Sequence, residues 1–210
     1  MSADEAIRAA REIGLDGICF TEHDRAWEAS LIQDLRDRHG FPVFRGVEVM
    51  LQGGIEMLVF GLNVDFTALL RLVDLREMVS AAGGFMVYAH PFRALPEHAV
   101  GGTGRADPVL SQEEISRVDA IEGRNGHNRE FCNQAALEMA DRHGLKTTGG
   151  SDAHAESQIG TCVTVFERVI STEADLLSEL AAGRFTSASF RRRETWSWRE
   201  DTRTIERRWL

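Results

Sequence analysis

Apolar runs of strand length alternate along the chain with segments of helical periodicity, and this alternation predicts an α/β fold built on a mainly parallel sheet. The units are numerous enough to favour a closed barrel over an open sheet. With 210 residues, the chain has the length of one ordinary domain, which buries roughly 70% of the surface that its unfolded form would expose. The sequence contains no linker or low-complexity stretch that would divide it.

The N-terminal half begins with a helix. Ser2-x-x-Glu5 has the form of a capping box, an apolar stripe follows it, and Gly14 stands where a helix commonly ends. The next elements are predicted as a strand, a helix, a strand, a hairpin arm, a helix and a strand, over residues 15–20, 27–38, 42–47, 55–62, 65–82 and 85–88.

The C-terminal half continues the alternation after a Gly- and Pro-rich loop over residues 93–108. A short helix is expected to begin at a second capping box, Ser111-x-x-Glu114. The following elements are predicted as a strand, a helix, two strands, a helix and a strand, over residues 118–122, 128–142, 145–148, 161–166, 173–182 and 185–190. We therefore expect residues 1–190 to form the domain and residues 191–210, with seven Arg and three of the four Trp, to form a tail.

Composition restricts the class of function. The net charge of -9 argues against stable binding of duplex nucleic acid. No apolar stretch is long enough to span a membrane, and the acidic start of the chain does not resemble a signal peptide. Cys19, Cys132 and Cys162 lie far apart and form no C-x-x-C pair, so we expect packed thiols in a reducing compartment, the cytoplasm.

Four short clusters carry side chains that bind metals. The strongest is the glycine-rich bend with Asp152 and His154, and similar clusters occur around His23, Glu48 and His90. Each follows an apolar strand by zero to three residues, and the C-terminal strand ends of a parallel barrel converge on one mouth. Because carboxylates and imidazoles together suit divalent cations, the clusters predict a metal hydrolase.

Each cluster also has a structural explanation. Asp152 could be a helix N-cap, His23 and His90 could be loop and turn residues, and Glu48 could be a strand-end carboxylate in solvent. Glu48 lies between two valines on a predicted buried strand, however, where a carboxylate needs a positive partner, such as a pair of cations that it bridges.

Further candidates follow the same strands. Asn125 and His127 come after the strand at residues 118–122, although the neighbouring Asn128 is an equally good helix cap that would explain this segment. Arg93 and Arg124 stand beside predicted ligands, where a planar guanidinium can bind a phosphate in bidentate fashion, and a salt bridge to surface acids is the alternative.

The motifs T-E-H-D, G-V-E, A-H-P, I-E-G-R-N-G and G-G-S-D-A-H, in this order and spacing, resemble the PHP (polymerase and histidinol phosphatase) domain family over about residues 2–190. The resemblance implies a distorted (β/α)7 TIM-like barrel that hydrolyses phosphate esters with a metal-activated water. It implies divalent cations, Zn, Mn or Fe, from one to three in number. Histidinol phosphatases, nucleotide and oligonucleotide phosphoesterases and polymerase-associated exonucleases belong to this family.

The resemblance also implies roles for single residues. His23 and His154 look like ligands of one cation, Glu48 like a bridge between the other two, His90 like a ligand of the second and Asp152 like a ligand of the first. His127 is a further candidate ligand, and Arg93 and Arg124 are candidates for stabilising charge on the reacting phosphate.

The chain departs from the family at its start. The family's opening strand, which ends in His-x-His, has no counterpart here, because the chain begins at the cap of the helix that follows, and Asn125 aligns where the second metal site often has His. Either translation starts upstream and supplies the strand, or this is a short form with a damaged site. A barrel without its first strand exposes a sheet edge, which we expect the tail, a second copy of the chain or a rearrangement of the sheet to cover.

The predicted function is a metal-dependent phosphoesterase acting on a small phosphorylated metabolite, a nucleotide or an oligonucleotide. The alternative is a truncated or degenerate PHP-like domain of little activity that acts as a binding module. Metal content and phosphatase rate distinguish the two.

Overall fold

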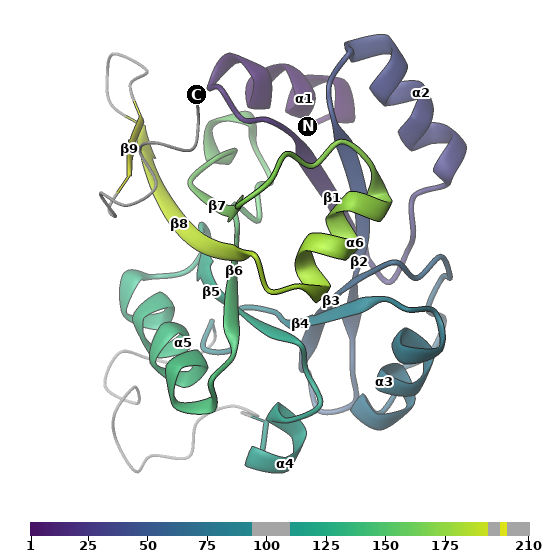
Figure 1. Cartoon of the computed structure of the whole chain (residues 1–210), viewed down its shortest axis with the longest axis vertical. Helices are drawn as coiled ribbons and strands as arrows, with labels where there is room; N and C mark the ends of the chain where they lie inside the picture. Colours follow the sequence, from purple (N-terminus) through teal and green to yellow (C-terminus); the bar gives the residue numbers. More distant parts are fainter. Residues whose placement is uncertain (94–109, 193–197, 201–210) are drawn as a thin grey trace.

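The structure is a computed structural model that describes residues 1–93, 110–192 and 198–200 (Figure 1). Most of the loop predicted over residues 93–108 lies outside the described residues, as do residues 193–197 and 201–210 of the predicted tail. The described helices are α1 (Ala3–Glu12), α2 (Ala29–His39), α3 (Leu72–Ala81), α4 (Gln112–Ile115), α5 (Glu130–His143), α6 (Glu173–Ala181) and the short 3-10 helix η2 (Glu156–Gln158).

The strands confirm the predicted α/β class. They are β1 (Ile18–His23), β2 (Val43–Met50), β3 (Glu56–Phe60), β4 (Phe85–Tyr88), β5 (Ala120–Asn125), β6 (Lys146–Gly150), β7 (Cys162–Phe166), β8 (Phe185–Arg192) and β9 (Trp198–Glu200). Several run two or three residues further than predicted at their C-terminal ends, so that His23, Glu48 and Asn125 lie within strands.

Six strands form a curled sheet in the order β1-β2-β3-β4-β5-β6, which gives the molecule the shape of half a barrel (Figure 1). The pairs β1/β2, β4/β5 and β5/β6 are parallel, but β3 is antiparallel to both β2 and β4. The predicted hairpin arm is confirmed, because the turn at Gly53 and Gly54, both with positive φ, reverses the chain directly beside β2. Since β4 pairs with its other edge, this segment is also a central strand of the sheet. The detail of a (β/α)7 barrel is not confirmed.

The last strands form a separate antiparallel sheet in the order β7-β8-β9. The described part of the predicted tail belongs to it, since Arg191 and Arg192 extend β8 and residues 198–200 pair back onto it. This part of the tail does not pair with β1, which is an edge of the larger sheet as expected.

The first helix forms as its sequence predicts. Ser2 Oγ accepts a hydrogen bond from the backbone N–H of Glu5, whose carboxylate accepts one from the N–H of Ser2, and Gly14 has a φ of 82°. The helix predicted over 65–82 was wrong in its first half: α3 begins at Leu72, because Asp65 accepts a hydrogen bond from Ala26 N–H and Phe66 N–H donates to Asp24, which holds this segment against the end of β1.

Helices cover the outer face of the sheet. Val47, Val49 and Val59 pack against α3 and α5, while α1 and α2 pack around Val43. On the inner face, Phe44, Leu58, Phe60 and Val87 pack against Leu176 and Leu180 of α6, which lies across the strands in Figure 1. Glu48 shares its inner face with Phe44, so it lies above this apolar layer, at the mouth of the half-barrel.

A cavity of about 1100 Å³ opens along the inner face between β1 and β7. Its lining combines the apolar inner face with seven of the polar residues described below, namely His23, Glu48, His90, Glu122, Asn125, Asp152 and His154. None of the described helices has the length and hydrophobicity needed to cross a bilayer. The three cysteines are free, and Cys132 and Cys162 are buried, as predicted for packed thiols.

Candidate metal centre

The parallel pairing of β1 and β2 places His23 beside Glu48. The two are register partners, and His23 Nδ1 lies 3.2 Å from Glu48 Oε2. The carboxylate of the neighbouring Asp24 accepts a hydrogen bond from the backbone N–H of Met50. The last residue of β1 is thereby directed at the carboxylate of β2.

His90 follows β4 and reaches the same carboxylate. Its Nε2 lies 2.7 Å from Glu48 Oε1, and both residues are buried, at 6% and 7% exposure. Burial lowers the pKa of His90, but the hydrogen bond with Glu48 and the charge of Glu122 outweigh it, so the pKa is above its ordinary value. Glu48 therefore contacts two imidazoles, consistent with the positive partner that its burial requires.

Glu56, a residue that the sequence reasoning missed, completes this group. It is the first residue of β3, and its carboxylate lies 3.8 Å from His23 Nδ1 and 3.5 Å from His90 Nε2. Burial and the neighbouring Glu48 raise its pKa. The sequence candidates all lie at C-terminal strand ends, whereas Glu56 lies at the N-terminal end of β3. Because β3 is antiparallel to its neighbours, this end is the one that lies at the mouth. The pairing of β3 with β2 was the signal that could have found it.

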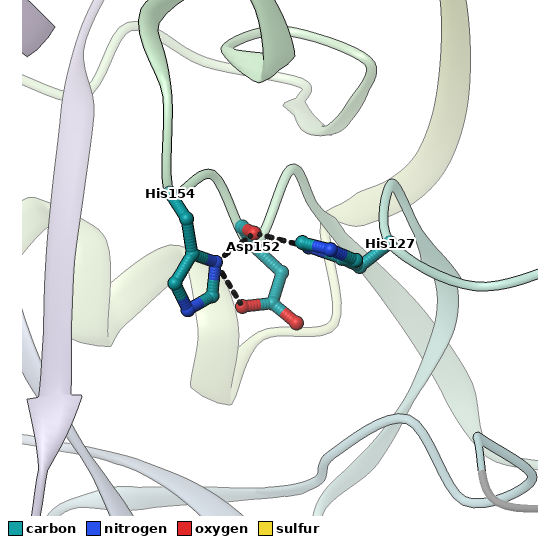
Figure 2. A group of neighbouring side chains, drawn as sticks. All are labelled: His127, Asp152 and His154. Atoms are coloured by element: carbon teal, nitrogen blue, oxygen red, sulfur yellow. Dashed lines mark hydrogen bonds and ion pairs between the residues drawn. The ribbon is translucent and has the colours of Figure 1, made fainter.

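A second group forms around Asp152 (Figure 2). The imidazoles of His127 and His154 flank this residue, and the Nδ1 atom of each lies 3.0 Å from its backbone carbonyl oxygen. A carbonyl can only accept, so both Nδ1 atoms donate to it. The ligand atoms of these three residues lie within 4.8 Å of one another, as do those of His23, Glu48 and Glu56.

Asp152 is not the N-cap of a helix, the alternative that the sequence allowed, because η2 begins after Ala155. Its carboxylate forms an ion pair with Arg93 and accepts a 3.3 Å hydrogen bond from Asn125 Nδ2. Burial raises the pKa of Asp152. The charge and hydrogen bond of Arg93 and the hydrogen bond of Asn125 lower it by more, so the pKa is below its usual value.

Glu122, also missed from the sequence, connects the two groups. It is 3% exposed, and its Oε2 accepts hydrogen bonds from the backbone N–H of His90 at 2.9 Å and from Asn125 Nδ2 at 3.1 Å. Burial raises the pKa of Glu122 to about 7. It lies on the inner face of β5, three residues before Asn125 and within the I-E-G-R-N-G motif, but the candidates that the sequence offered in this segment were Asn125 and His127, which follow it.

Arg124 is not brought to these groups. Its Nη1 donates to Ser189 Oγ at 2.9 Å and lies 3.7 Å from Glu130 Oε1. These contacts correspond to the salt-bridge alternative. Arg93 is the guanidinium that lies at the cluster.

Backbone strain is concentrated at the mouth. Among the described residues, the non-glycine residues with positive φ are Asp24, His90 and Asp152, and all three stand where a strand leads into the mouth. Such conformations cost about 1–3 kcal/mol each and occur where the surrounding structure imposes them, often at functional sites.

The donor set fits divalent cations. Glu48, Glu56, Glu122 and Asp152 gather four carboxyl groups at one mouth, where Arg93 is the guanidinium that forms an ion pair. The raised pKa values of Glu56 and Glu122 reflect the free energy needed to hold charged carboxylates there. Imidazole nitrogens and carboxylate oxygens at these separations suit Zn²⁺, Mn²⁺ or Fe²⁺.

Known proteins resemble the chain in both sequence and fold. The family model described as PHP-associated matches residues 131–185, which include Asp152 and His154. A protein named "Probable phosphatase" from Caldicellulosiruptor bescii is 24% identical over 185 residues, which are 76% of this chain and 75% of the relative.

Solved structures share the fold. PsfC from Pseudomonas syringae superposes with a TM-score of 0.64 at 24% identity, over 87% of this chain and 80% of PsfC. A two-domain protein from Bacteroides vulgatus, described as containing a predicted PHP-like metal-dependent phosphoesterase, superposes with a TM-score of 0.59 at 17% identity, over 87% of this chain and 59% of that one.

Proposed function

Because this chain is a relative of the PHP proteins, we propose that it is a metal-dependent phosphoesterase, which hydrolyses a phosphate ester with a water activated by divalent cations. The observation that carries the proposal is the buried contact between Glu48 and His90. His23 contacts the same carboxylate, Glu56 lies beside both histidines, and the Asp152 group lies at the same mouth. The names of the phosphatase and phosphoesterase relatives support the reaction class.

In this proposal His23, Glu48, His90, Asp152, His154 and His127 are the ligand candidates. Bound divalent cations would supply Lewis-acid activation of water and neutralise charge on the phosphoryl oxygens. Glu122 accepts a hydrogen bond from the backbone N–H of His90 and thereby helps to hold the backbone of this histidine in place. Zinc, manganese and iron all suit such a set of ligands.

Arg93 is the proposed phosphate-binding side chain. It forms an ion pair with Asp152 and is 37% exposed, so its guanidinium could contact a ligand in the mouth. A planar guanidinium offers paired donors to two phosphoryl oxygens and stabilises charge that develops in the transition state. Arg124, held by Ser189 and Glu130, is a weaker candidate for this role.

The substrate proposed is a small phosphorylated metabolite or nucleotide, with an oligonucleotide end as the larger option. The chain carries a net charge of -9, which disfavours long duplex nucleic acid. The alternative of a degenerate binding module is not favoured by the named relatives.

Hydrolysis of 4-nitrophenyl phosphate and bis(4-nitrophenyl) phosphate by chain reconstituted with Mn²⁺ or Zn²⁺ tests the reaction class. Turnover of the monoester identifies a phosphatase, and turnover of the diester identifies a phosphodiesterase. If the chain cleaves neither ester, and also releases no phosphate from a panel of sugar phosphates and nucleoside monophosphates, the proposed function is wrong.

A further inference from the structure

We propose that Glu56 is a metal ligand that completes, with His23, Glu48 and His90, a divalent-cation site of two imidazoles and two carboxylates. The inference rests on the proposed function, because it assigns a ligand within the same mouth. It adds a residue from the antiparallel strand β3, which lies outside every motif that the sequence offered.

The sheet fixes Glu56 in this place from both sides. On β2, Met50 is its register partner, so Glu56 and Glu48 are diagonal neighbours on the same face of the antiparallel pair. On the β4 side, the backbone N–H of Ala89 donates to the carbonyl oxygen of Glu56 at 3.1 Å. Glu56 is thereby held beside the residue that precedes His90.

The separations match those of ligands around one ion. Donor atoms about 2.1 Å from a cation in tetrahedral or slightly expanded geometry lie roughly 3–4.5 Å from each other. His23 Nδ1 lies 3.2 Å from Glu48 Oε2 and 3.8 Å from Glu56 Oε1, and one ligand atom from each of these residues falls within a common 4.8 Å limit. His90 Nε2 adjoins these three residues from the β4 side, 3.5 Å from Glu56 Oε2 and at the hydrogen-bonding distance of 2.7 Å from Glu48 Oε1.

The negative charge of two neighbouring carboxylates favours a bound cation at this place. The side chains of Glu48 and Glu56 are only 9% and 17% exposed, and within the described parts of the chain their ion-pair partners are His23 and His90 alone. Two neighbouring carboxylates with limited access to water repel each other, and a divalent cation between them removes that repulsion. Two oxygens and two nitrogens favour Zn²⁺, Mn²⁺ or Fe²⁺ over Ca²⁺, which prefers an all-oxygen shell.

This site shares no ligand with the group of His127, Asp152 and His154. The two groups should therefore bind cations separately, and a change at Glu56 should affect one of them and spare the other.

Calorimetric titration of chelator-treated chain with Mn²⁺, and separately with Zn²⁺, tests the assignment. We expect Glu56→Gln, which keeps the size of the side chain but removes its charge, to weaken one of two cation sites by at least about 10- to 100-fold and to leave the other unchanged. Glu12→Gln, on the exposed surface of α1, is the matched control and should bind like the wild type.

The assignment is overturned if Glu56→Gln keeps wild-type affinity at both cation sites, since Glu56 would then only pair with the two histidines. Anomalous scattering from wild-type crystals grown with Zn²⁺ provides a measurement that does not depend on a folded variant. A peak among His23, Glu48 and Glu56 supports the site, and occupancy confined to the Asp152 group excludes it. If Glu56→Gln loses cation binding but the wild type has no phosphatase activity, the proposed function is wrong while Glu56 is still a metal ligand.

Discussion

His90 Nε2 and Glu48 Oε1 lie 2.7 Å apart, although 42 positions of sequence separate the two residues. Both side chains are buried, and the strands β2, β3 and β4 that bring them together form the centre of the curled sheet. The contact links the two ends of the candidate site, because the backbone N–H of the same histidine donates to Glu122.

Removal of the charge of Glu48 should reduce cation affinity and hydrolysis strongly and thermal stability only slightly. Glu48→Gln keeps a hydrogen-bond acceptor for the histidines but removes the charge that a cation requires, so we expect cation affinity and hydrolysis to fall by about 100-fold or more. The thermal unfolding midpoint of the chelated protein should change little. Equilibrium dialysis, a 4-nitrophenyl phosphate assay and a melting curve measure the three quantities, and a variant with wild-type activity would exclude Glu48 from the site.

Substitution of Arg93 should affect substrate binding, whereas substitution of Arg124 should not. Arg93→Ala removes a guanidinium from the mouth, and we expect a KM for the phosphate ester raised by about 10-fold or more, which corresponds to the loss of a charge-assisted hydrogen bond. Arg93→Lys should restore only part of the affinity, because an ammonium cannot bind two oxygens in a fork. Steady-state kinetics measure both effects.

Arg124→Ala is the matched comparison for Arg93. Its partners are Ser189 and Glu130, so the variant should unfold at a lower temperature while keeping its KM. A rise in KM as large as that of the Arg93 variant would reverse the assignment of the phosphate-binding residue.

The buried carboxyl of Glu122 should make the metal-free protein less stable as the pH rises. Its pKa is about 7 in the folded chain and near 4.5 when exposed, so the native state keeps a proton that the unfolded state releases between these values. The free energy of unfolding therefore decreases from about pH 4.5 to 7, by at most about 3 kcal/mol from this group. The raised pKa of His90 acts in the same direction, since its stabilising charge is lost as the pH rises through that pKa.

Urea denaturation of the chelated protein at several pH values measures this dependence. Glu122→Gln keeps an oxygen for the N–H of His90 but cannot ionise, so it should flatten the decline, whereas the exposed Glu138→Gln should not. An unchanged slope in the Glu122 variant would show that this carboxyl is not the group that titrates.

Strands β6 and β7 lie so close together at Gly149 that there is no space for a side chain at this position. A Cβ there would overlap the carbonyl oxygen of Val163, a backbone atom that cannot rotate away. We expect Gly149→Ala to destabilise the protein by several kcal/mol. Gly144→Ala, with a φ of 64° and no atom within 4 Å of the added Cβ, should cost only about 1 kcal/mol, and chemical denaturation would compare the two.

Local sequence predicted the elements but not all of their partners. The capping boxes at Ser2 and Ser111 and the apolar run of β4 depend on neighbours in sequence, and they form as expected. The predicted hairpin arm gave the direction of β3 relative to β2, but periodicity does not encode that β4 pairs with its other edge or that its first residue lies at the mouth. Consequently the sequence offered His23, Glu48 and His90 as candidates, whereas Glu56 joined them only when the sheet was assembled.

The orientation of the arginines was likewise beyond the sequence. Arg93 and Arg124 both follow candidate ligands, but a register shift between Glu122 and Arg124 accompanies the turn of the latter toward Ser189 on β8. A bulge of this kind changes which face a side chain occupies, and no local pattern marked it.

The most direct test of the account is the metal content of the purified chain, measured together with its rate of hydrolysis of 4-nitrophenyl phosphate before and after chelation. The account predicts at least one equivalent of Zn²⁺ or Mn²⁺ per chain after reconstitution, with a rate that disappears on chelation and returns when the cation is restored. Less than one equivalent of bound cation, together with no hydrolysis, would contradict it.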